Sequence, residues 1–215
     1  MEIKKRTKKS IICKIILVGD SGVGKTCIIN RYLNKYTPNP HTTINTSFFS
    51  KVEIINNYKI DFQIWDTVGQ EQFRSLNNLF FKNSHICIIV YDITRPESFN
   101  NIKDYWYESA ITNGLEGIIC CIVGNKDDLS QYEKVDRNEV KEFCDEINAL
   151  LKFTSAKDNY CIDELFEELG NKFINSDFMK EYTENQADMK DNQDNFAVDE
   201  INKQKIKTKD NKRCC

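Results

Sequence analysis

Glycine, proline and histidine are scarce in this sequence, and it has no long apolar run. Of 215 residues, 8 are Gly, 3 are Pro and 2 are His, which excludes collagen-like and Pro/Gly-rich low-complexity chains. The longest apolar run, Gly117 to Gly124, is far shorter than the ~20 residues that cross a bilayer, so no transmembrane helix is expected. A mixed segment follows the basic start, and Glu2 removes a myristoylation site, so we expect an intracellular protein without a secretory signal.

The composition is that of an ordinary globular domain. Hydrophobic residues make up 40% of the chain and charged residues 29%. The nine cysteines lack the paired short spacings of a zinc site. Most of them lie in or beside apolar positions, which predicts small core residues rather than disulfides or metal ligands. These are Cys13, Cys27, Cys87, Cys120, Cys121, Cys144 and Cys161.

Charge divides the chain into three parts. Residues 1–10 form a basic arm with five Lys or Arg and one Glu, which we interpret as solvated in preference to a second membrane contact. Residues 11–175 carry the apolar patterning of a folded domain. Residues 176–215 are acidic, then basic, then end in Cys214-Cys215, and with so few apolar residues this tail is expected to be disordered.

Strand-like and helix-like patterns alternate within residues 11–175. Four apolar runs have the character of strands buried on both faces: Ile11–Val18, Ile86–Tyr91, Gly117–Val123 and Leu150–Phe153. Val52–Ile55 and Tyr58–Trp65 flank Asn56-Asn57 and predict an antiparallel hairpin. Helical spacing relates three sets between them: Phe99 to Trp106, Val140 to Ile147 and Ile162 to Phe173. The alternation predicts an α/β fold with a mostly parallel sheet, whose ligand lies beyond the carboxyl ends of the strands.

The first strand is followed by a phosphate-binding motif. GDSGVGKT, Gly19 to Thr26, matches G-x-x-x-x-G-K-[ST] between a strand and a helical segment. Small residues let successive backbone N–H groups converge on a phosphate, and the start of the helix adds its positive dipole end. Lys25 would hold the terminal phosphates, and the Thr26 hydroxyl would bind Mg²⁺.

The motif GNKDDL indicates the base. Asn125, Lys126 and Asp128 form N-K-x-D at the end of the Gly117–Val123 strand. The carboxylate of Asp128 can accept both N1–H and N2–H₂ of guanine, whereas adenine presents an acceptor at N1. Ser155, Ala156 and Lys157 follow the next strand, and their backbone N–H groups could meet the guanine oxygen, although a turn that caps the next helix explains them equally well.

WDTVGQE, at the end of the hairpin, supplies the remaining chemistry. Asp66 would hold Mg²⁺ through water, the N–H of Gly69 would contact a γ-phosphate, and Gln70 would orient the attacking water. A turn that ends the strand is the alternative interpretation of Asp66 to Gly69.

Taken in order, these motifs resemble those of a small GTPase of the Ras superfamily, over roughly Ile11 to Asn175. QIWDTVGQEQFRSL, VYDIT, TSAK and the terminal Cys-Cys are most similar to the Rab family. The resemblance implies a P-loop NTPase-type, doubly wound sheet of six strands, mostly parallel with one antiparallel strand, with helices on both faces. It also implies a monomeric GTPase that hydrolyses GTP to GDP with Mg²⁺ as cofactor.

The same resemblance implies roles for further residues. Thr43 would bind Mg²⁺ with Thr26 and Asp66, and act in catalysis with Gln70, Lys25 and Gly69. Phe48, Trp65 and Phe80 would form an aromatic effector surface, or they pack in the core. Cys214 and Cys215 would carry prenyl groups. The phosphate contacts would come from Asp20, Ser21, Gly22, Val23, Gly24, Lys25, Thr26, Cys27, Thr43 and Gly69.

The resemblance further implies partners and a place in the cell. These are GTP and GDP, an exchange factor, a GTPase-activating protein, a GDP-dissociation inhibitor, an escort protein and effectors, at the cytoplasmic face of an intracellular membrane with a cytosolic pool. The chain departs from the family at Asn45, where Rab proteins usually have Gly, at Val68, where they have Ala, and at Phe80 to Ser84. Val68 is β-branched in a segment that must change conformation, which makes the hydrolysis rate an open question.

The resemblance implies a GTP-dependent switch in vesicle-mediated transport, and there are three alternatives to this function. Val68 makes a GTP-dependent binding module with weak catalysis conceivable. A P-loop alone also fits an ATP-using kinase or ATPase, against which Asp128 argues. The basic ends could bind nucleic acid, but residues 201–213 adjoin the lipid-acceptor cysteines, where basic side chains attract anionic lipid. We therefore expect a membrane contact and no nucleic acid.

Overall fold

The computed structural model describes residues 10–37, 43, 46–68, 80–180 and 182. The chain divides into two units, residues 1–173 and residues 174–215. Within the described part of the second unit, Lys180 pairs with Asp177 at 2.5 Å. In the residues that the structure describes, no helix is both long and apolar enough to span a bilayer.

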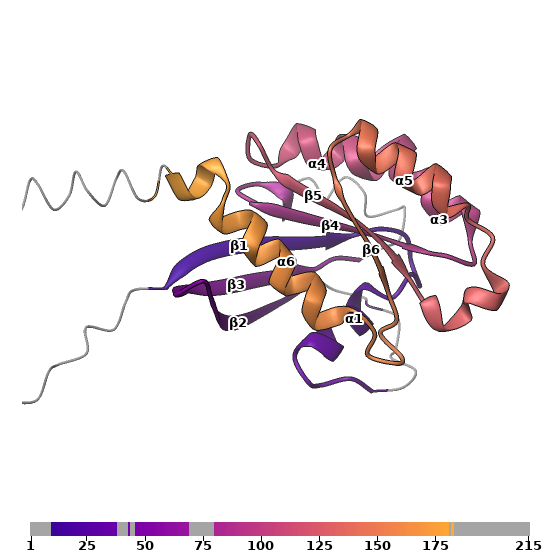
Figure 1. Ribbon diagram of the computed structural model, residues 1–215, viewed down its shortest axis with the longest axis horizontal. Coiled ribbons are helices and arrows are strands. Elements are labelled where there is room, and N and C mark those ends of the chain that lie inside the picture. Colours follow the sequence, from indigo (N-terminus) through magenta and orange to yellow (C-terminus); the bar gives the residue numbers. More distant parts are fainter. Residues whose placement is uncertain (1–9, 38–42, 44–45, 69–79, 181, 183–215) are drawn as a thin grey trace, which may run out of the picture. The chain divides into compact units, whose positions relative to one another are not determined.

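Six strands form one sheet in the order β2-β3-β1-β4-β5-β6 (Figure 1). They are β1 (Ile11–Val18), β2 (Ser47–Ile55), β3 (Tyr58–Asp66), β4 (Ile86–Asp92), β5 (Ile119–Asn125) and β6 (Leu150–Thr154). All neighbouring pairs are parallel except β2 and β3, which form the antiparallel hairpin around Asn56-Asn57. The predicted fold class, with its single antiparallel strand, is confirmed.

The strands follow the apolar runs closely except β2, which begins at Ser47 instead of the expected Val52. β1 has the predicted bounds, and β4 and β5 are buried at every position, as expected for strands covered on both faces. β2 alternates between half-buried and exposed positions because it lies at the edge of the sheet. The Gly117 start predicted for the fifth strand is wrong, since Gly117 takes a φ of 74° in the preceding turn and β5 begins at Ile119.

Helices cover both faces of the sheet (Figure 1). One face carries α1 (Lys25–Tyr32) and α6 (Ile162–Ile174), and the other carries α3 (Pro96–Asn101), the π-helical segment η2 (Ile102–Trp106), α4 (Tyr107–Asn113) and α5 (Arg137–Glu146). The 3₁₀ segment η3 (Asp127–Tyr132) follows β5. The spacing of Phe99, Ile102 and Trp106 correctly predicts buried helical positions, but the interruption by η2 was not predicted.

Gly170 brings α6 onto the β2–β3 hairpin. A Cβ atom at this position would lie 2.2 Å from Ile55 Cδ1 and 3.1 Å from Phe62 Cζ. The neighbouring Phe166 ring stacks on Tyr32 at a centroid distance of 3.7 Å. α1 and α6 therefore pack against each other, and α6 packs against the hairpin.

The cysteines of the described residues are all free thiols. Five of them are buried core residues, as predicted: Cys13, Cys87, Cys120, Cys121 and Cys144. Cys27 and Cys161 are half-buried instead, because they lie in the first turn of α1 and in the loop that precedes α6. Among the described residues no group of His, Cys, Asp and Glu could hold a metal ion by itself.

Candidate functional site

The predicted motifs meet at the carboxyl ends of the strands. β3, β1, β4, β5 and β6 are consecutive in the sheet and point the same way, so the segments that follow them gather at one edge (Figure 1). Open α/β sheets bind ligands at this edge. Residues as distant in sequence as Val23 and Asn125 touch here, with Asn125 Nδ2 donating to the Val23 carbonyl oxygen at 2.8 Å.

The loop from Gly19 to Gly24 depends on two glycines. Gly19 has a φ of 134°, and a Cβ there would lie 2.1 Å from the Val90 carbonyl oxygen. Gly24 has a φ of 101°, and its Cβ would lie 2.2 Å from Asn125 Nδ2. α1 begins directly after Gly24, with no side-chain hydrogen bond capping its N-terminus in the described structure. Its first N–H groups and positive dipole end are available to an anion.

Lys25 lies inside this loop and is 5% exposed. Its Nζ donates to the carbonyl oxygens of Gly19 at 2.7 Å and Asp20 at 2.9 Å. Burial lowers the pKa of Lys25 to about 8, although the charges of Asp66 and Asp20 oppose the decrease. A buried ammonium whose hydrogen bonds go to carbonyl groups is only partly compensated, so a phosphate beside it would gain a strong partner.

Three oxygen ligands from three segments meet beside Lys25. Thr26 Oγ1 donates to Asp66 Oδ2 at 2.6 Å and lies 2.7 Å from Thr43 Oγ1. Asp66 is 1% exposed, and its Oδ1 has no hydrogen-bond partner in the described part of the chain. Burial raises the pKa of Asp66, while Thr26 and Lys25 oppose the rise. Hydroxyl and carboxylate oxygens are the donors that Mg²⁺ prefers, so these residues fit the ion.

Asn125 joins the phosphate loop to the segment after β6. It is 2% exposed, and its Oδ1 accepts from Thr154 Oγ1 at 3.2 Å and from the Ala156 N–H at 3.3 Å. The predicted guanine contact through Ala156 therefore involves an N–H that already has a partner within the chain. Lys126 has a φ of 70°, and its Nζ pairs with Asp92 Oδ2 at 2.6 Å. Burial would raise the pKa of Asp92, but the hydrogen bonds from Lys126 and Thr94 lower it.

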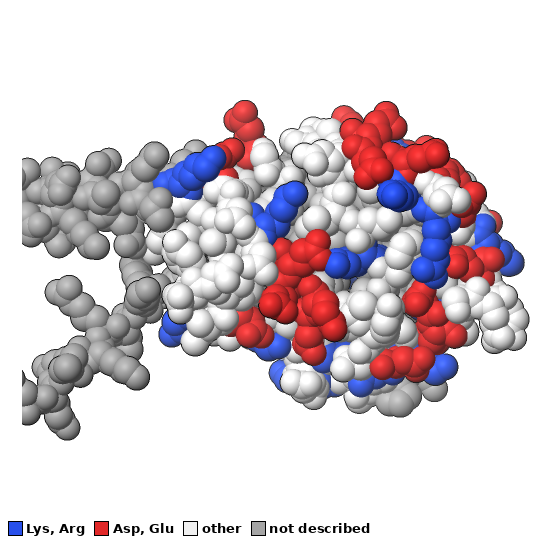
Figure 2. Space-filling model, viewed as in Figure 1, with Lys and Arg blue, Asp and Glu red and all other residues white. Residues whose placement is uncertain are grey.

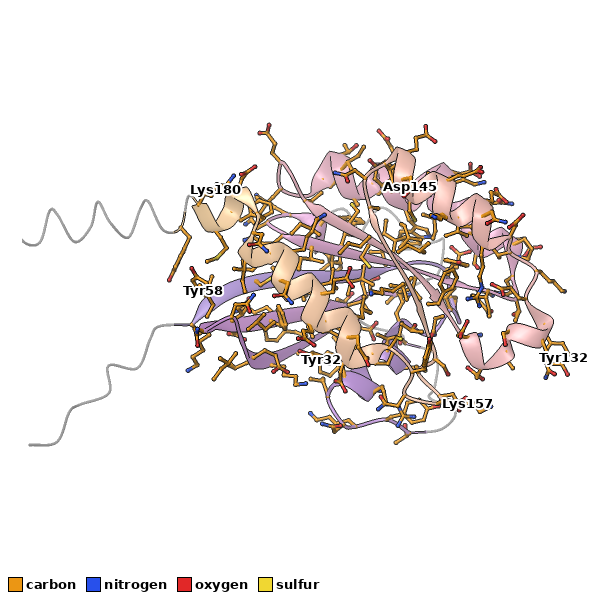
Figure 3. All side chains as sticks on the ribbon, in the orientation of Figure 1. Tyr32, Tyr58, Tyr132, Asp145, Lys157 and Lys180 are labelled. Carbon is orange, nitrogen blue, oxygen red and sulfur yellow. The ribbon has the colours of Figure 1, made fainter. Side chains whose placement is uncertain are left out.

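The carboxylate of Asp128 is held by two residues of the loop that follows β6. Ser155 Oγ donates to its Oδ1 at 2.7 Å, and Lys157 Nζ lies 3.4 Å from its Oδ2. Both residues belong to the loop after β6, where Lys157 is labelled (Figure 3). Ser155 Oγ also accepts from the Asp158 N–H at 3.0 Å, so a turn forms here, but it does not cap the next helix, because α6 begins only at Ile162. A cavity of about 280 Å³ adjoins this group and is lined by Asp128, Ser155 and Tyr160 among others.

The three predicted effector-surface aromatics are adjacent. The Trp65 ring lies 5.1 Å from that of Phe48 and 5.9 Å from that of Phe80. Phe48 is 49% exposed, whereas Trp65 and Phe80 are half-buried against the core. Lys14 Nζ lies 5.3 Å from the Trp65 ring and donates to the Phe80 carbonyl oxygen at 2.8 Å. The group combines core packing with an exposed edge.

The sequence analysis named Asp20 and Ser21 but missed the residues that hold them, Trp106, Asn101 and Arg95. Asp20 accepts from Trp106 Nε1 at 3.0 Å and from Asn101 Nδ2 at 2.7 Å. Arg95 donates to the Ser21 carbonyl oxygen at 3.0 Å. These contacts join residues 74 to 86 positions apart in the sequence. The one sequence signal was that the N–H of a buried Trp needs an acceptor, which the Asp beside Gly19 could supply.

Arg31 supports the loop after β6 and was also missed. Its guanidinium donates to the carbonyl oxygens of Ala156 at 2.7 Å and Lys157 at 2.6 Å. It also lies 3.7 Å from the centroid of the Tyr36 ring. Four predicted residues, Gly69, Gln70, Cys214 and Cys215, lie outside the described residues.

Comparisons with known proteins agree on one relationship. The family model described as "Ras family" matches residues 14–175. Mouse (Mus musculus) Ras-related protein Rab-22A is 39% identical over 165 residues, covering 76% of this chain and 84% of its own. Ras-related protein Rab-1C of Dictyostelium discoideum is 40% identical, covering 75% and 80%. Rat (Rattus norvegicus) Ras-related protein Rab-31 is 41% identical, covering 72% and 79%.

Proposed function

Since this chain belongs to the Ras family of small GTPases, with Rab proteins as its relatives, we propose that it works as a membrane-anchored switch in vesicle-mediated protein transport. It is a GTPase, which converts GTP to GDP and phosphate. The observation that carries the proposed site is the meeting of Thr26, Thr43 and Asp66 beside the buried Lys25.

The phosphate end of the site would be formed by residues 20–27 with Thr43 and Gly69. The start of α1 and Lys25 bind the phosphates, and the carbonyl bonds of Lys25 give way to phosphate oxygens. Thr26, Thr43 and Asp66, the last through water, would hold Mg²⁺, whose chemistry is to neutralise the charge that develops on the phosphate oxygens. Thr43 thereby links the segment before β2 to the nucleotide.

The base end would select guanine. Asp128 accepts the two guanine donors, while Ser155 and Lys157 fix its carboxylate in place. Asn125, Lys126 and Ala156 support this end through their contacts with Val23, Asp92 and each other. Because adenine would leave the Asp128 oxygens facing an acceptor, the ATP-using alternative is disfavoured.

Hydrolysis would depend on Gln70, which orients the attacking water, and on the Gly69 N–H. We expect Gln70→Leu to lower the single-turnover rate at least ~10-fold. Equal rates for the two proteins would contradict the role of Gln70. Asn30→Ala, at a half-buried position of α1, serves as a control that should keep the wild-type rate. Rapid turnover would need a GTPase-activating protein, which in related GTPases supplies an arginine that stabilises the charge of the transition state.

The switch would act through the aromatic surface of Phe48, Trp65 and Phe80. Its exposed edge at Phe48 lies on β2, directly after the Thr43 segment. Effectors would read the GTP state here, and an exchange factor, GDP-dissociation inhibitor and escort protein would complete the cycle. Phe48→Ala should weaken capture of a GTP-dependent partner without changing GTP affinity.

Prenyl groups on Cys214 and Cys215 would anchor the protein to the cytoplasmic face of an intracellular membrane. Two lipid chains give the stable anchoring that one does not. Cys214→Ser with Cys215→Ser should move the protein to the cytosolic fraction and leave GTP affinity unchanged. Cys161→Ser, which changes a half-buried thiol of the loop before α6, is the matched control. An unchanged distribution of the double variant would contradict the role of the two cysteines as an anchor.

A GTP-dependent binding module with weak catalysis is the second candidate. Val68 is 6% exposed, and the neighbouring Thr67 hydroxyl donates to the Leu17 carbonyl oxygen at 2.7 Å. Burial of Val68 and the Thr67 hydrogen bond restrict the movement of residues 67 and 68. Because Gln70 follows two positions later, this restriction favours slow hydrolysis. A hydrolysis assay beside a binding assay on Val68→Ala and wild type separates the candidates, because a faster variant with equal binding identifies Val68 as the cause.

A further inference from the structure

A cavity of about 350 Å³ lies on the α1 and α6 side of the sheet, outside the nucleotide site. Its apolar wall includes the side chains of Tyr32, Ile55 and Phe62, all of them buried. Asn56 Nδ2, at the hairpin turn, donates to Asn171 Oδ1 of α6 at 2.7 Å. The walls are thus held by contacts among α1, α6 and the hairpin, and we call this space the α6–hairpin cavity.

Negative charge predominates around the α6–hairpin cavity. Its lining includes the carboxylates of Glu53, Asp163 and Glu167. Lys51 neutralises one of them, since its Nζ lies 2.8 Å from Glu53 Oε1. Figure 2 shows carboxylates gathered over α6. The cavity therefore has an excess of acidic groups.

The two α6 carboxylates have no charged partner among the described residues. Asp163 and Glu167 are exposed and one helical turn apart, a spacing at which like charges repel. Within the described residues neither of them has a hydrogen bond or ion pair. A segment with cationic side chains could pair with these carboxylates, while the aliphatic parts of its side chains pack against the apolar wall.

A cationic segment of the chain starts close to this cavity. Ile11 at the start of β1 is in register with Ile60, and Ile60 is in register with Glu53. Two strand spacings therefore separate the end of the basic arm from Glu53, about 10 Å. Residues 1–9 contain Lys4, Lys5, Arg6, Lys8 and Lys9, and nine extended residues reach up to ~30 Å.

We propose that residues 1–9 fold back into the α6–hairpin cavity, with their basic side chains against Asp163 and Glu167. This replaces the solvated arm of the sequence analysis. The docked arm bridges α6 and the hairpin, whose strand β3 ends at Asp66 and whose strand β2 begins after Thr43. While they lie in the cavity, the Lys and Arg side chains of residues 1–9 cannot bind a lipid surface or another protein. The proposal is independent of the nucleotide assigned to the other edge of the sheet.

The test is zero-length coupling of lysine amines to carboxylates with a carbodiimide, applied to the full-length chain and read by peptide mass spectrometry. We expect the arm lysines to couple to Asp163 and Glu167, and the yield to fall at least ~10-fold in about 1 M salt, where the screening length is ~3 Å. Asp163→Asn with Glu167→Gln should abolish these links and leave the far-ultraviolet circular dichroism unchanged, because both residues are exposed.

The matched control neutralises two exposed carboxylates of α5, Glu142→Gln with Asp145→Asn. Asp145 lies on the other side of the sheet from Tyr32 (Figure 3). This variant should keep the wild-type yield of arm to α6 links.

A charge exchange gives the second measurement. Lys4→Glu with Lys5→Glu should reduce the links several-fold, and adding Asp163→Lys with Glu167→Lys should restore coupling between the same positions. Links spread evenly over the surface carboxylates would mean a solvated arm and overturn the proposal. Links that join two chains would assign the cavity to a second copy and overturn it as well.

Discussion

The two ends of the candidate nucleotide site satisfy their polar groups differently. At the base end, Asn125 and Asp128 find hydrogen-bond partners within the chain before any ligand binds. At the phosphate end, Asp66 Oδ1 lacks a partner among the described residues, and burial lowers the pKa of Lys25 to about 8. Buried charge without full compensation costs free energy. The phosphate end should therefore gain most of the binding energy, while the pre-formed base end supplies selectivity.

Removing the selective group should have the largest effect. Asp128→Asn replaces an acceptor of both guanine donors with an amide that presents a donor of its own, and we expect GDP affinity to fall by ~10⁴-fold. Competition of labelled GDP by unlabelled nucleotides measures the change. Asp127→Asn is the control, because the Asp127 carboxylate pairs with Arg137 at 2.5 Å, whereas Ser155 and Lys157 contact Asp128. A loss below tenfold in Asp128→Asn would end the assignment of the base end.

The metal-binding group at the phosphate end should come next. Thr26→Ala removes the hydroxyl that meets Asp66 and Thr43, and we expect release of labelled GDP in Mg²⁺ to accelerate at least ~10-fold. Wild-type release should accelerate when a chelator removes Mg²⁺, whereas release from the variant should change little. A variant that responds to chelation as wild type does would place the ion elsewhere.

The residue shared by both ends should affect stability as well as binding. Asn125→Ala leaves the Val23 carbonyl and the Thr154 hydroxyl without their partner, and each buried polar group left unpaired costs ~1–3 kcal/mol. Urea unfolding of the nucleotide-free protein measures the loss. Thr154→Val removes one bond of 3.2 Å and should cost less; an equal cost in the two variants would mean that Asn125 does not couple the ends.

The smallest expected effect is on the pH dependence of stability, and it comes from His85, which lies away from the carboxyl ends of the strands. His85 Nδ1 accepts from the Lys14 N–H at 2.9 Å, and burial, with a smaller contribution from the charge of Lys14, lowers its pKa below 6.5. Because the unfolded chain then binds more protons, the free energy of unfolding should decrease as pH falls below 6.5. His85→Asn, which keeps an acceptor, should flatten this decrease. Nucleotide affinity should not follow it.

Much of the fold could be predicted because its signals are local. Ile11–Val18 and Ile86–Tyr91 are apolar at nearly every position, which is the pattern of strands buried on both faces. The π-helical segment Ile102–Trp106 could not be predicted, since Phe99, Ile102 and Trp106 keep a helical spacing through it. Trp106, its last residue, donates to Asp20, a contact across 86 positions that no local spacing reveals.

The candidate site divides in the same way. Lys25, Thr26, Asp66 and Asp128 belong to motifs whose chemistry is legible in short segments. Arg31 was invisible because it acts on the carbonyl oxygens of Ala156 and Lys157, and any residue type could supply a carbonyl group. Likewise, the ion pair between Lys126 and Asp92 depends on β4 and β5 being neighbours in the sheet, which the two segments do not reveal separately.

Gly170 limits the size of the side chain that α6 can carry at this position. Glycine inside a helix forfeits ~1 kcal/mol relative to alanine, yet a methyl group here would require the end of the Ile55 side chain to move. A saturation mutagenesis screen should disfavour large side chains at this position, with alanine the least harmful, while it tolerates most residues at the exposed Glu164 nearby. Variants that shorten Ile55 to alanine should relax that intolerance, since the missing carbons open the room that a small side chain needs.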